Sequence, residues 1–278
     1  MHEAMVDGRR IAYTRVGLGP ALVLLHGGLG DSRSWRPQLE ACAAEHTVLA
    51  WDAPGCGRSS DPPATWRMPE YADCVAGWLG AIGVDRAHVL GLSWGSSLAL
   101  ELYRRHPGLP SSLVLASAYA GWAGSLPPGE VAERVALGLA WADLPGEEIA
   151  AAFLPTLLTP DAAPDAVEDV LAVLRDVRGA GTLPALLSMA EADLRDVLPT
   201  IRVPTLLLYG SEDVRSPLRV AHELHRAIPG SDLVVLPGVG HESNFEAPDA
   251  FTREVLQFLR RASGRTAEWT GTYGVLPR

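Results

Sequence analysis

The sequence predicts an α/β protein in which helices cover both faces of a parallel sheet, and three observations support this. Short apolar runs typical of buried strands alternate with helical patterns in the first part of the chain. Over residues 120–195 the strand patterns stop, and helical periodicity broken by proline and glycine replaces them. Strand patterns then return, so the two outer parts are expected to form one sheet with a helical insertion between them.

The first strands and helices follow from the spacing of apolar residues. A hairpin is expected to turn at Asp7-Gly8 and to continue through residues 11–16. Helical periodicity predicts helices at residues 69–82 and 96–106, which would connect the strands as successive βαβ units. Uninterrupted apolar runs predict strands buried on both faces at residues 21–25, 48–51, 88–92 and 113–116.

The insertion and the last part of the chain complete the expected architecture. Four helices are expected in the insertion, at residues 131–141, 147–158, 166–177 and 183–193. Strands at 205–208 and 232–236 and helices at 218–228 and 248–261 follow. The predicted division is a core of residues 1–119 and 196–264, a helical cap of residues 120–195, and a tail of residues 265–278 to which no role is assigned.

Composition and charge limit the partners. The chain has 278 residues, 47% of them hydrophobic, which is enough for a large buried core. Its 23 basic and 33 acidic residues give a formal net charge of -10, which offers no attraction to nucleic acid or anionic lipid. The apolar runs are too short to span a membrane, and residues 1–10 lack the apolar stretch of a signal peptide. We therefore expect a cytoplasmic protein that acts on a small molecule, without nucleic-acid or membrane partners.

Two residue types limit the chemistry. All 23 basic residues are arginine, so a lysine Schiff base and a phosphate loop ending in Gly-Lys-Ser/Thr are excluded. Cys42, Cys56 and Cys74 are odd in number and have no Cys-x-x-Cys spacing, which predicts free thiols rather than disulfides or a zinc site. No metal ion and no cofactor is expected.

Ser93 is the candidate nucleophile. It lies in Gly91-Leu92-Ser93-Trp94-Gly95, directly after a predicted strand and before a predicted helix. A sharp strand-to-helix turn of this kind holds the serine hydroxyl exposed above the sheet, and small flanking residues allow the close backbone approach that the turn requires.

A histidine and a carboxylate are expected to activate Ser93, because a serine hydroxyl needs a base to accept its proton. His241 follows the last predicted strand in a glycine-rich loop, at the edge where parallel sheets bind ligands. Asp213 follows the preceding predicted strand, with Glu212 as the alternative carboxylate. Two backbone amides should bind the oxyanion: that of Trp94, and that of Gly28 or, as the reserve, Leu29. His26 is expected to hold the Gly28 loop in place.

Five markers occur in one order along the chain. They are His26-Gly27-Gly28, residues 52–59 (Asp-Ala-Pro-Gly-Cys-Gly-Arg-Ser), the serine turn at 91–95, the strand end at 210–213, and Gly240-His241 followed by Glu246-Ala247-Pro248. On these markers the sequence resembles the α/β-hydrolase fold superfamily from about residue 6 to residue 262. The resemblance implies an eight-stranded, mostly parallel sheet with a helical cap over its carboxyl edge.

Ser93 narrows the reaction that this resemblance implies. It argues against the haloalkane dehalogenase and epoxide hydrolase branches, which use aspartate at this position. The expected activity is that of a serine esterase or lactonase, with medium-chain esters or acyl-homoserine lactones as candidate substrates. Leu29, Trp122 and Trp141 are expected to line an apolar substrate pocket.

Two alternatives remain open. Residues 91–100 and 55–59 are similar to proline iminopeptidases, but this chain has Leu29-Gly30 where that family usually has Pro-Gly. In addition, no sequence pattern marks an acidic residue as the group that would hold a free amine. The second alternative is a receptor of this fold that keeps the triad and uses the pocket to bind a signal molecule.

Overall fold

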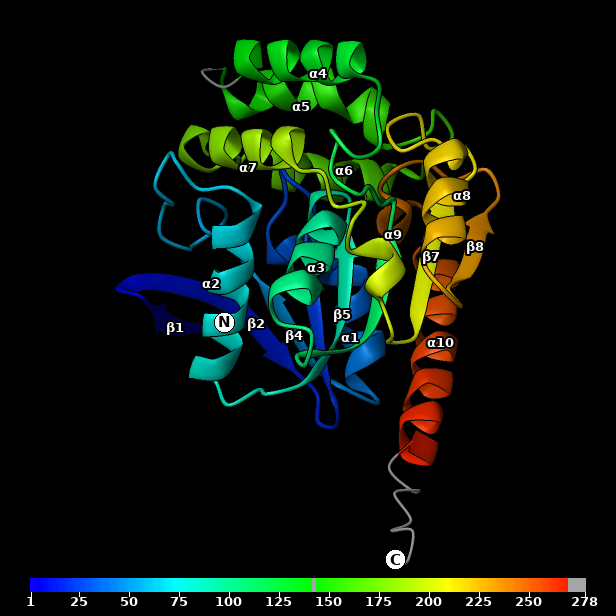
Figure 1. Ribbon diagram of the computed structural model, residues 1–278. Coiled ribbons are helices and arrows are strands. Elements are labelled where there is room, and N and C mark those ends of the chain that lie inside the picture. The colour runs from blue at the N-terminus through cyan, green and yellow to red at the C-terminus, as the bar shows by residue number, and fades with distance from the viewer. Residues whose placement is uncertain (142–143, 270–278) are drawn as a thin grey trace, which may run out of the picture.

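The computed structural model describes residues 1–141 and 144–269, with side chains up to residue 264. Eight strands form one sheet in the order β1-β2-β4-β3-β5-β6-β7-β8 (Figure 1). The pairs β1–β2 and β2–β4 are antiparallel, and every other neighbouring pair is parallel. The strands are β1 (His2–Val6), β2 (Arg9–Val16), β3 (Ala21–Leu25), β4 (Thr47–Trp51), β5 (Ala87–Leu92), β6 (Pro110–Ala116), β7 (Thr205–Gly210) and β8 (Asp232–Leu236).

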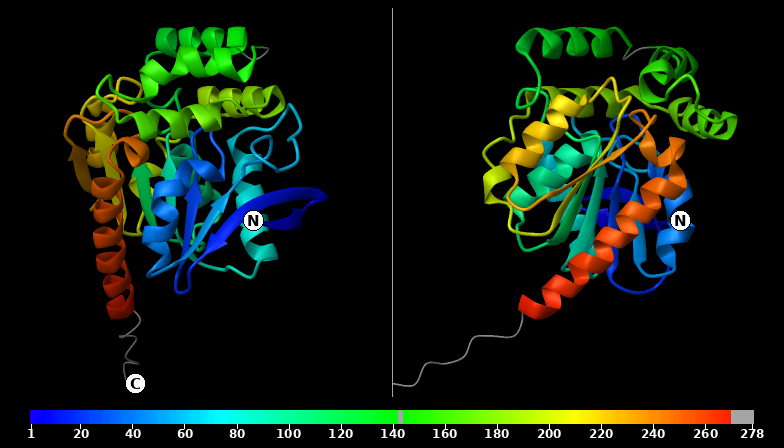
Figure 2. Two further views of the ribbon diagram at one scale, coloured as in Figure 1. Left: turned by 180° about the vertical axis from the view of Figure 1, so that it is seen from behind. Right: turned by 90° about the vertical axis from the view of Figure 1, so that its right-hand side faces the viewer.

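The helices cover both faces of the sheet and its carboxyl edge (Figures 1 and 2). They are α1 (Arg36–Ala43), α2 (Met68–Ala81), α3 (Trp94–Arg105), α4 (Pro128–Trp141), α5 (Gly146–Leu157), α6 (Pro164–Leu174), α7 (Gly179–Glu191), α8 (Leu218–Ala227), α9 (Ser243–Glu246) and α10 (Pro248–Trp269), with short 3-10 helices at Ser32–Trp35 and Leu198–Thr200. The eight-stranded, mostly parallel α/β fold is confirmed.

Alternation along each strand divides the core into two layers, because successive side chains point to opposite faces of a sheet. In β3, Val23 and Leu25 pack into the hydrophobic cluster that includes residues of α2, α3 and α8. Leu22 and Leu24 pack into the other cluster, with residues of α1 and α10. Both faces are therefore apolar, which is why the strands read as continuous apolar runs in the sequence.

The structure differs from the sequence expectations at the ends and connections of elements. α1 and α9 were not expected, since the first has only eight residues and the second four. α10 extends to Trp269 rather than Arg261, so the first part of the expected tail is helical, and the rest of that tail lies outside the described residues. Residues 262–269 carry no apolar periodicity, but a helix already packed on the sheet extends at little cost.

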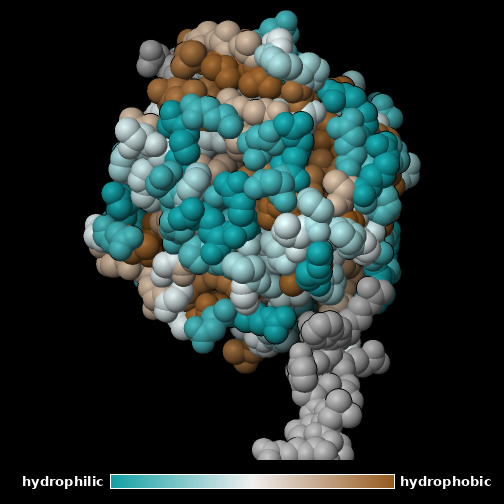
Figure 3. All heavy atoms as spheres, in the orientation of Figure 1, coloured by the Kyte–Doolittle hydropathy of each residue, from teal (hydrophilic) through white to brown (hydrophobic). Residues whose placement is uncertain are grey.

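Helices α4 to α7, here called the cap, lie over the carboxyl edge of the sheet (Figure 1). Ion pairs connect the cap to the core, among them Arg178–Asp61 at 2.6 Å and Arg67–Glu191 at 2.8 Å. Apolar surface gathers on the outer side of the cap (Figure 3), where Leu137 and Leu139 are 48% and 49% exposed. Within residues 1–141 and 144–269, no helix is long and apolar enough to cross a bilayer.

Candidate active site

Ser93 occupies the sharp turn between β5 and α3, with φ of 54°. The flanking glycines are required there by close backbone contacts. A Cβ on Gly91 would lie 2.1 Å from the carbonyl oxygen of Gly95, and a Cβ on Gly95 would lie 2.1 Å from that of Leu25. No other residue type fits these two positions without moving the backbone, so the Gly-x-Ser-x-Gly pattern follows from the geometry of the turn.

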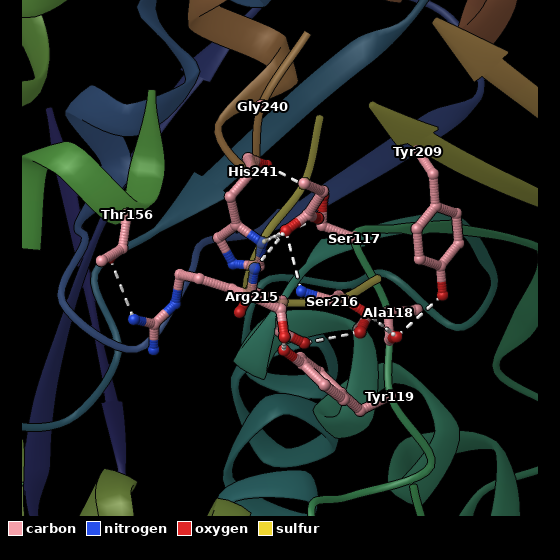
Figure 4. A network of polar contacts seen from close by, with 12 residues as sticks. Ser117, Ala118, Tyr119, Thr156, Tyr209, Arg215, Ser216, Gly240 and His241 are labelled. Carbon is pink, nitrogen blue, oxygen red and sulfur yellow. Dashed lines mark hydrogen bonds and ion pairs between the residues drawn. The ribbon is translucent and has the colours of Figure 1, made fainter. Parts of the chain in front are cut away.

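His241 and Asp213 form a buried pair at the carboxyl ends of β8 and β7. The Nδ1 atom of His241 lies 2.9 Å from both carboxylate oxygens of Asp213, and the two side chains are 2% and 0% exposed. The hydroxyl of Ser117 donates to the His241 carbonyl oxygen at 2.8 Å and fixes the loop (Figure 4). With Nδ1 bound to Asp213, Nε2 is the ring nitrogen available to the cavity.

Asp213 is held in its charged form by its neighbours. Burial raises the pKa of this carboxyl, but the charge and hydrogen bond of His241 and the amide of Ser216 together lower the pKa below its ordinary value. Its Oδ1 accepts the backbone amides of Arg215 at 2.9 Å and Ser216 at 2.8 Å. Glu212, the alternative carboxylate, is instead exposed and accepts a hydrogen bond from Ser211.

One cavity brings the expected site residues together. Its lining includes Gly28, Leu29, Ser93, Trp94, Trp122, Trp141 and His241. Gly28 and Trp94 are neighbours, since a Cβ on Gly28 would lie 3.5 Å from the Cβ of Trp94. The amide of Trp94 belongs to the first turn of α3, where backbone N–H groups lack an acceptor within the helix. The two expected oxyanion donors therefore lie side by side in the cavity that Ser93 lines.

His26 is part of the loop that carries Gly28. Its Nδ1 donates to the Gly27 carbonyl oxygen at 2.7 Å, and its Nε2 accepts the amide of Ala53 at 3.0 Å. Burial lowers the pKa of His26, which favours the neutral ring that this pattern of one donor and one acceptor requires. These bonds connect the Gly28 loop to the loop after β4.

The walls of the cavity are mainly apolar and come from both the core and the cap. The cavity has a volume of about 110 Å³. Trp141 of α4 packs edge-on against Phe153 of α5, with ring centroids 4.5 Å apart. Trp122 is 7% exposed and also belongs to the core cluster, so it supports the fold as well as the cavity.

The structure adds two charged residues that the sequence analysis did not single out. Arg215 and Glu242 also line the cavity. Arg215 lies two residues after Asp213 and Glu242 lies directly after His241, and this closeness to predicted site residues was the signal available in the sequence. Burial raises the pKa of Glu242 and lowers that of Arg215. Among the described residues, no group of three or more histidine, cysteine, aspartate or glutamate side chains could hold a metal ion.

Comparison with known proteins agrees with this fold. The model of the alpha/beta hydrolase fold family matches residues 20–248, and the chain therefore belongs to that family. A putative carbamate hydrolase RutD of Caulobacter sp. (strain K31) is 30% identical over 275 residues, which cover 93% of this chain and 98% of that protein.

Two solved structures are similar over nearly the whole chain. A thermophilic esterase from Thermogutta terrifontis superposes with a TM-score of 0.86 at 27% identity, covering 94% of this chain and 98% of that one. The enol-lactonase from Burkholderia xenovorans LB400 superposes with a TM-score of 0.85 at 28% identity, covering 93% of this chain and 100% of that one. The chain is thus a hydrolase of the alpha/beta fold.

Proposed function

We propose that this protein is a serine hydrolase that cleaves carboxylic esters or lactones through an acyl-enzyme on Ser93. The observation that carries the proposal is the buried His241–Asp213 pair, which shares one cavity with a serine at a positive-φ turn. A nucleophile, a base and a carboxylate that orients the base are the groups that acyl transfer requires.

The first half of the proposed reaction forms the acyl-enzyme. Nε2 of His241 accepts the Ser93 proton while Oγ attacks the carbonyl carbon of the substrate. The amides of Gly28 and Trp94 donate hydrogen bonds to the oxyanion. As the tetrahedral intermediate collapses, the bond to the alkoxide oxygen breaks and His241 returns the proton to that oxygen. In a lactone the released alcohol stays attached to the acyl group.

The second half frees the enzyme. His241 takes a proton from water, the resulting hydroxide attacks the acyl carbon, and Ser93 leaves with the proton. Asp213 stays charged throughout, keeps the imidazole in one tautomer, and stabilises the imidazolium that forms in each half. The lowered pKa of Asp213 matches this role.

The substrate class follows from the cavity and the relatives. Apolar walls that include Leu29, Trp122 and Trp141 suit a medium-length acyl chain. The two solved structures described above are named esterase and enol-lactonase, and the relative from Caulobacter sp. is named a putative carbamate hydrolase. Esters and lactones, including acyl-homoserine lactones, are the preferred substrate candidates. Their tetrahedral intermediates expel an alkoxide leaving group, which needs no catalytic group beyond the proposed triad and oxyanion donors.

Turnover of p-nitrophenyl butanoate by the native protein and by Ser93→Ala tests this proposal. The native protein should release nitrophenol, and Ser93→Ala should lose at least a thousandfold in kcat. Ser111→Ala is the matched control. Ser111 lies near the amino end of β6, away from the cavity, so this variant should keep native activity. A native protein that binds the ester or a lactone without turning it over would favour the receptor alternative.

An aminopeptidase is the second candidate, and Glu242 is the observation that favours it. This carboxyl lines the cavity and could hold a substrate's free amine. Its raised pKa weakens the case, because the neutral acid attracts an ammonium group less. Proline p-nitroanilide, compared with the ester series, distinguishes the two: a higher kcat/KM on the proline amide than on every ester and lactone would replace the esterase proposal.

A further inference from the structure

Arg215 places a guanidinium in the apolar cavity. It lies two residues after Asp213, in the loop that follows β7. Figure 4 shows its side chain extending towards Thr156 of α5. Among the described residues that line the cavity, it is the one arginine, and Glu242 is the one acid. The cationic end therefore lies in the same cavity as the proposed catalytic histidine and contacts the cap through Thr156.

The contacts of Arg215 hold the guanidinium in place without neutralising it. Nη1 donates to Thr156 Oγ1 at 3.2 Å, and Cζ lies 4.9 Å from the centre of the Phe153 ring. Thr156 donates its own proton to the Phe153 carbonyl oxygen, so its hydroxyl is oriented to accept. A guanidinium has five N–H donors, and in the described part of the chain this is the one side-chain hydrogen bond that the head group makes.

The acidic groups nearby are engaged elsewhere or are poor partners. Asp213 is taken by His241 and by two backbone amides. Glu130 pairs with Arg134 at 2.7 Å and Arg219 at 3.2 Å. Glu242 and Arg215 line the same cavity and attract each other, but they form no ion pair within the described residues. Arg215 stays protonated at neutral pH even though burial lowers its pKa, so its guanidinium has no carboxylate in ion-pair contact.

We propose that Arg215 binds a carboxylate carried by the substrate, so that the esters or lactones cleaved here are anionic molecules with a second carboxyl group. This inference rests on the proposed function and narrows its substrate class. The planar fork of a guanidinium matches a carboxylate with two parallel hydrogen bonds. An apolar wall with one oriented cation is the pattern of a site that accepts a short carbon chain with a charged end.

Selectivity follows from the cost of leaving a charge unpaired. A neutral substrate of the same shape would displace water from the guanidinium without replacing its hydrogen bonds. The anionic substrate replaces them and gains a charge-assisted pair. The carboxylate contact lies away from the reacting carbonyl, so its main effect should be on KM rather than on kcat.

Matched substrates test this directly. Monomethyl esters of succinic, glutaric and adipic acid carry a carboxylate, and the corresponding methyl esters with a primary amide in its place are neutral and nearly isosteric. At its best chain length, the native protein should have a kcat/KM about tenfold or more higher for the half-ester than for the amide ester. Equal or higher values for the amide ester at every length would overturn the proposal.

Two variants assign the preference to Arg215. Arg215→Met should lower kcat/KM on the half-ester by about 10- to 100-fold, mainly through KM, and leave the neutral esters within about threefold. Arg215→Lys keeps the charge without the fork and should fall between. Arg219→Met, at an exposed position of α8, is the matched control and should keep the native preference. An equal loss on both substrates in Arg215→Met would mean a structural role and would overturn the proposal.

A binding measurement separates this inference from the proposed function. Glutarate binding can be measured by isothermal titration calorimetry, with no need for turnover. Tenfold or weaker binding to Arg215→Met than to the native protein supports the carboxylate site even if no ester is cleaved. Equal binding to both, or none to the native protein, overturns it even if neutral esters are cleaved.

Discussion

At the scale of single residues, Ser93 shows how backbone and chemistry depend on each other. A non-glycine residue with φ of 54° is costly, and it persists here because strand β5, helix α3 and two close glycine contacts determine the turn from both sides. The strain directs the hydroxyl into the cavity instead of the sheet. The Gly-x-Ser-x-Gly motif is therefore required first by the backbone of the turn. The proposed chemistry depends on the position that this turn gives to the Ser93 hydroxyl.

The first prediction concerns the proposed triad. Ser93→Ala, His241→Ala and the double variant should lose kcat to similar degrees, at least a thousandfold, because nucleophile and base act as one unit and their losses do not add. Asp213→Asn should be milder but still lose orders of magnitude, since it disturbs the tautomer of His241. Steady-state kinetics on one ester measures all four. A near-native kcat in His241→Ala would remove that residue as the base.

The second prediction concerns pH and activity. A histidine base must be neutral to accept the Ser93 proton, so kcat/KM should rise with pH and then level off. Asp213 does not add a second step to this rise, because its pKa is lowered and it stays charged. A pH profile of kcat/KM measures this, and a flat profile with chemistry rate-limiting would contradict a histidine base.

At the scale of elements, the cap contacts the core through backbone atoms as well as through side chains. The first turn of α7 approaches the loop after β4 so closely that a Cβ on Gly181 would lie 2.3 Å from the Gly55 carbonyl oxygen. Arg178, just before α7, donates to the Ser59 carbonyl oxygen of the same loop at 2.9 Å. This contact positions α7, which contributes Thr182, Ala185 and Met189 to the cavity wall.

Gly181→Ala should therefore destabilise the protein by about 1 to 3 kcal/mol, as overpacking does, and raise KM. The sign of this stability change is diagnostic, because replacing glycine by alanine inside a helix otherwise stabilises the protein by about 1 kcal/mol. Gly80→Ala in α2, where nothing lies within 4 Å of the added Cβ, should be neutral or stabilising. Denaturant unfolding measures both, and a stabilised Gly181→Ala would show that the contact is not as close as described.

At the scale of the whole molecule, stability depends on buried histidines that must stay neutral. His88 of β5 is bound by the hydroxyl of Ser112 at 2.7 Å. Burial, together with the nearby His46, lowers the pKa of His88 from 6.5 to about 4. The unfolded chain binds a proton on this ring from about pH 6.5 downwards, whereas the folded protein binds it near pH 4. The stability from the neutral ring is complete above pH 6.5 and is lost as the pH falls to about 4.

This group should contribute about 3 kcal/mol to the fall in the free energy of unfolding across that range. His88→Gln should flatten the fall, and His222→Gln, the same exchange at an exposed position of α8, should keep the native slope. Urea unfolding at pH 4, 5, 6 and 7 measures the slopes. Equal slopes in the native protein and His88→Gln would show that His88 does not control acid stability.

Much of this molecule could be predicted from local patterns. Continuous apolar runs indicated β3 to β7 because both faces of those strands are buried, and β3 has the expected bounds, residues 21–25. Ser93, Asp213 and His241 could be proposed as a triad because each lies in the segment after the carboxyl end of a strand, where a parallel sheet gathers its functional groups. A local sequence pattern was enough at these positions because the backbone geometry limits which residue types fit.

The tertiary structure determined the features that no local sequence pattern could predict. Which strand lies beside which, the 2.9 Å contact between residues 213 and 241, and the close approach of α7 to Gly55 are contacts between distant segments. Arg215 and Glu242 read as ordinary charged residues in the sequence. Only the enclosure made by α5, α6 and α7 gives them a place in the cavity, because burial is a property of the folded chain and raises the cost of leaving a charge unpaired.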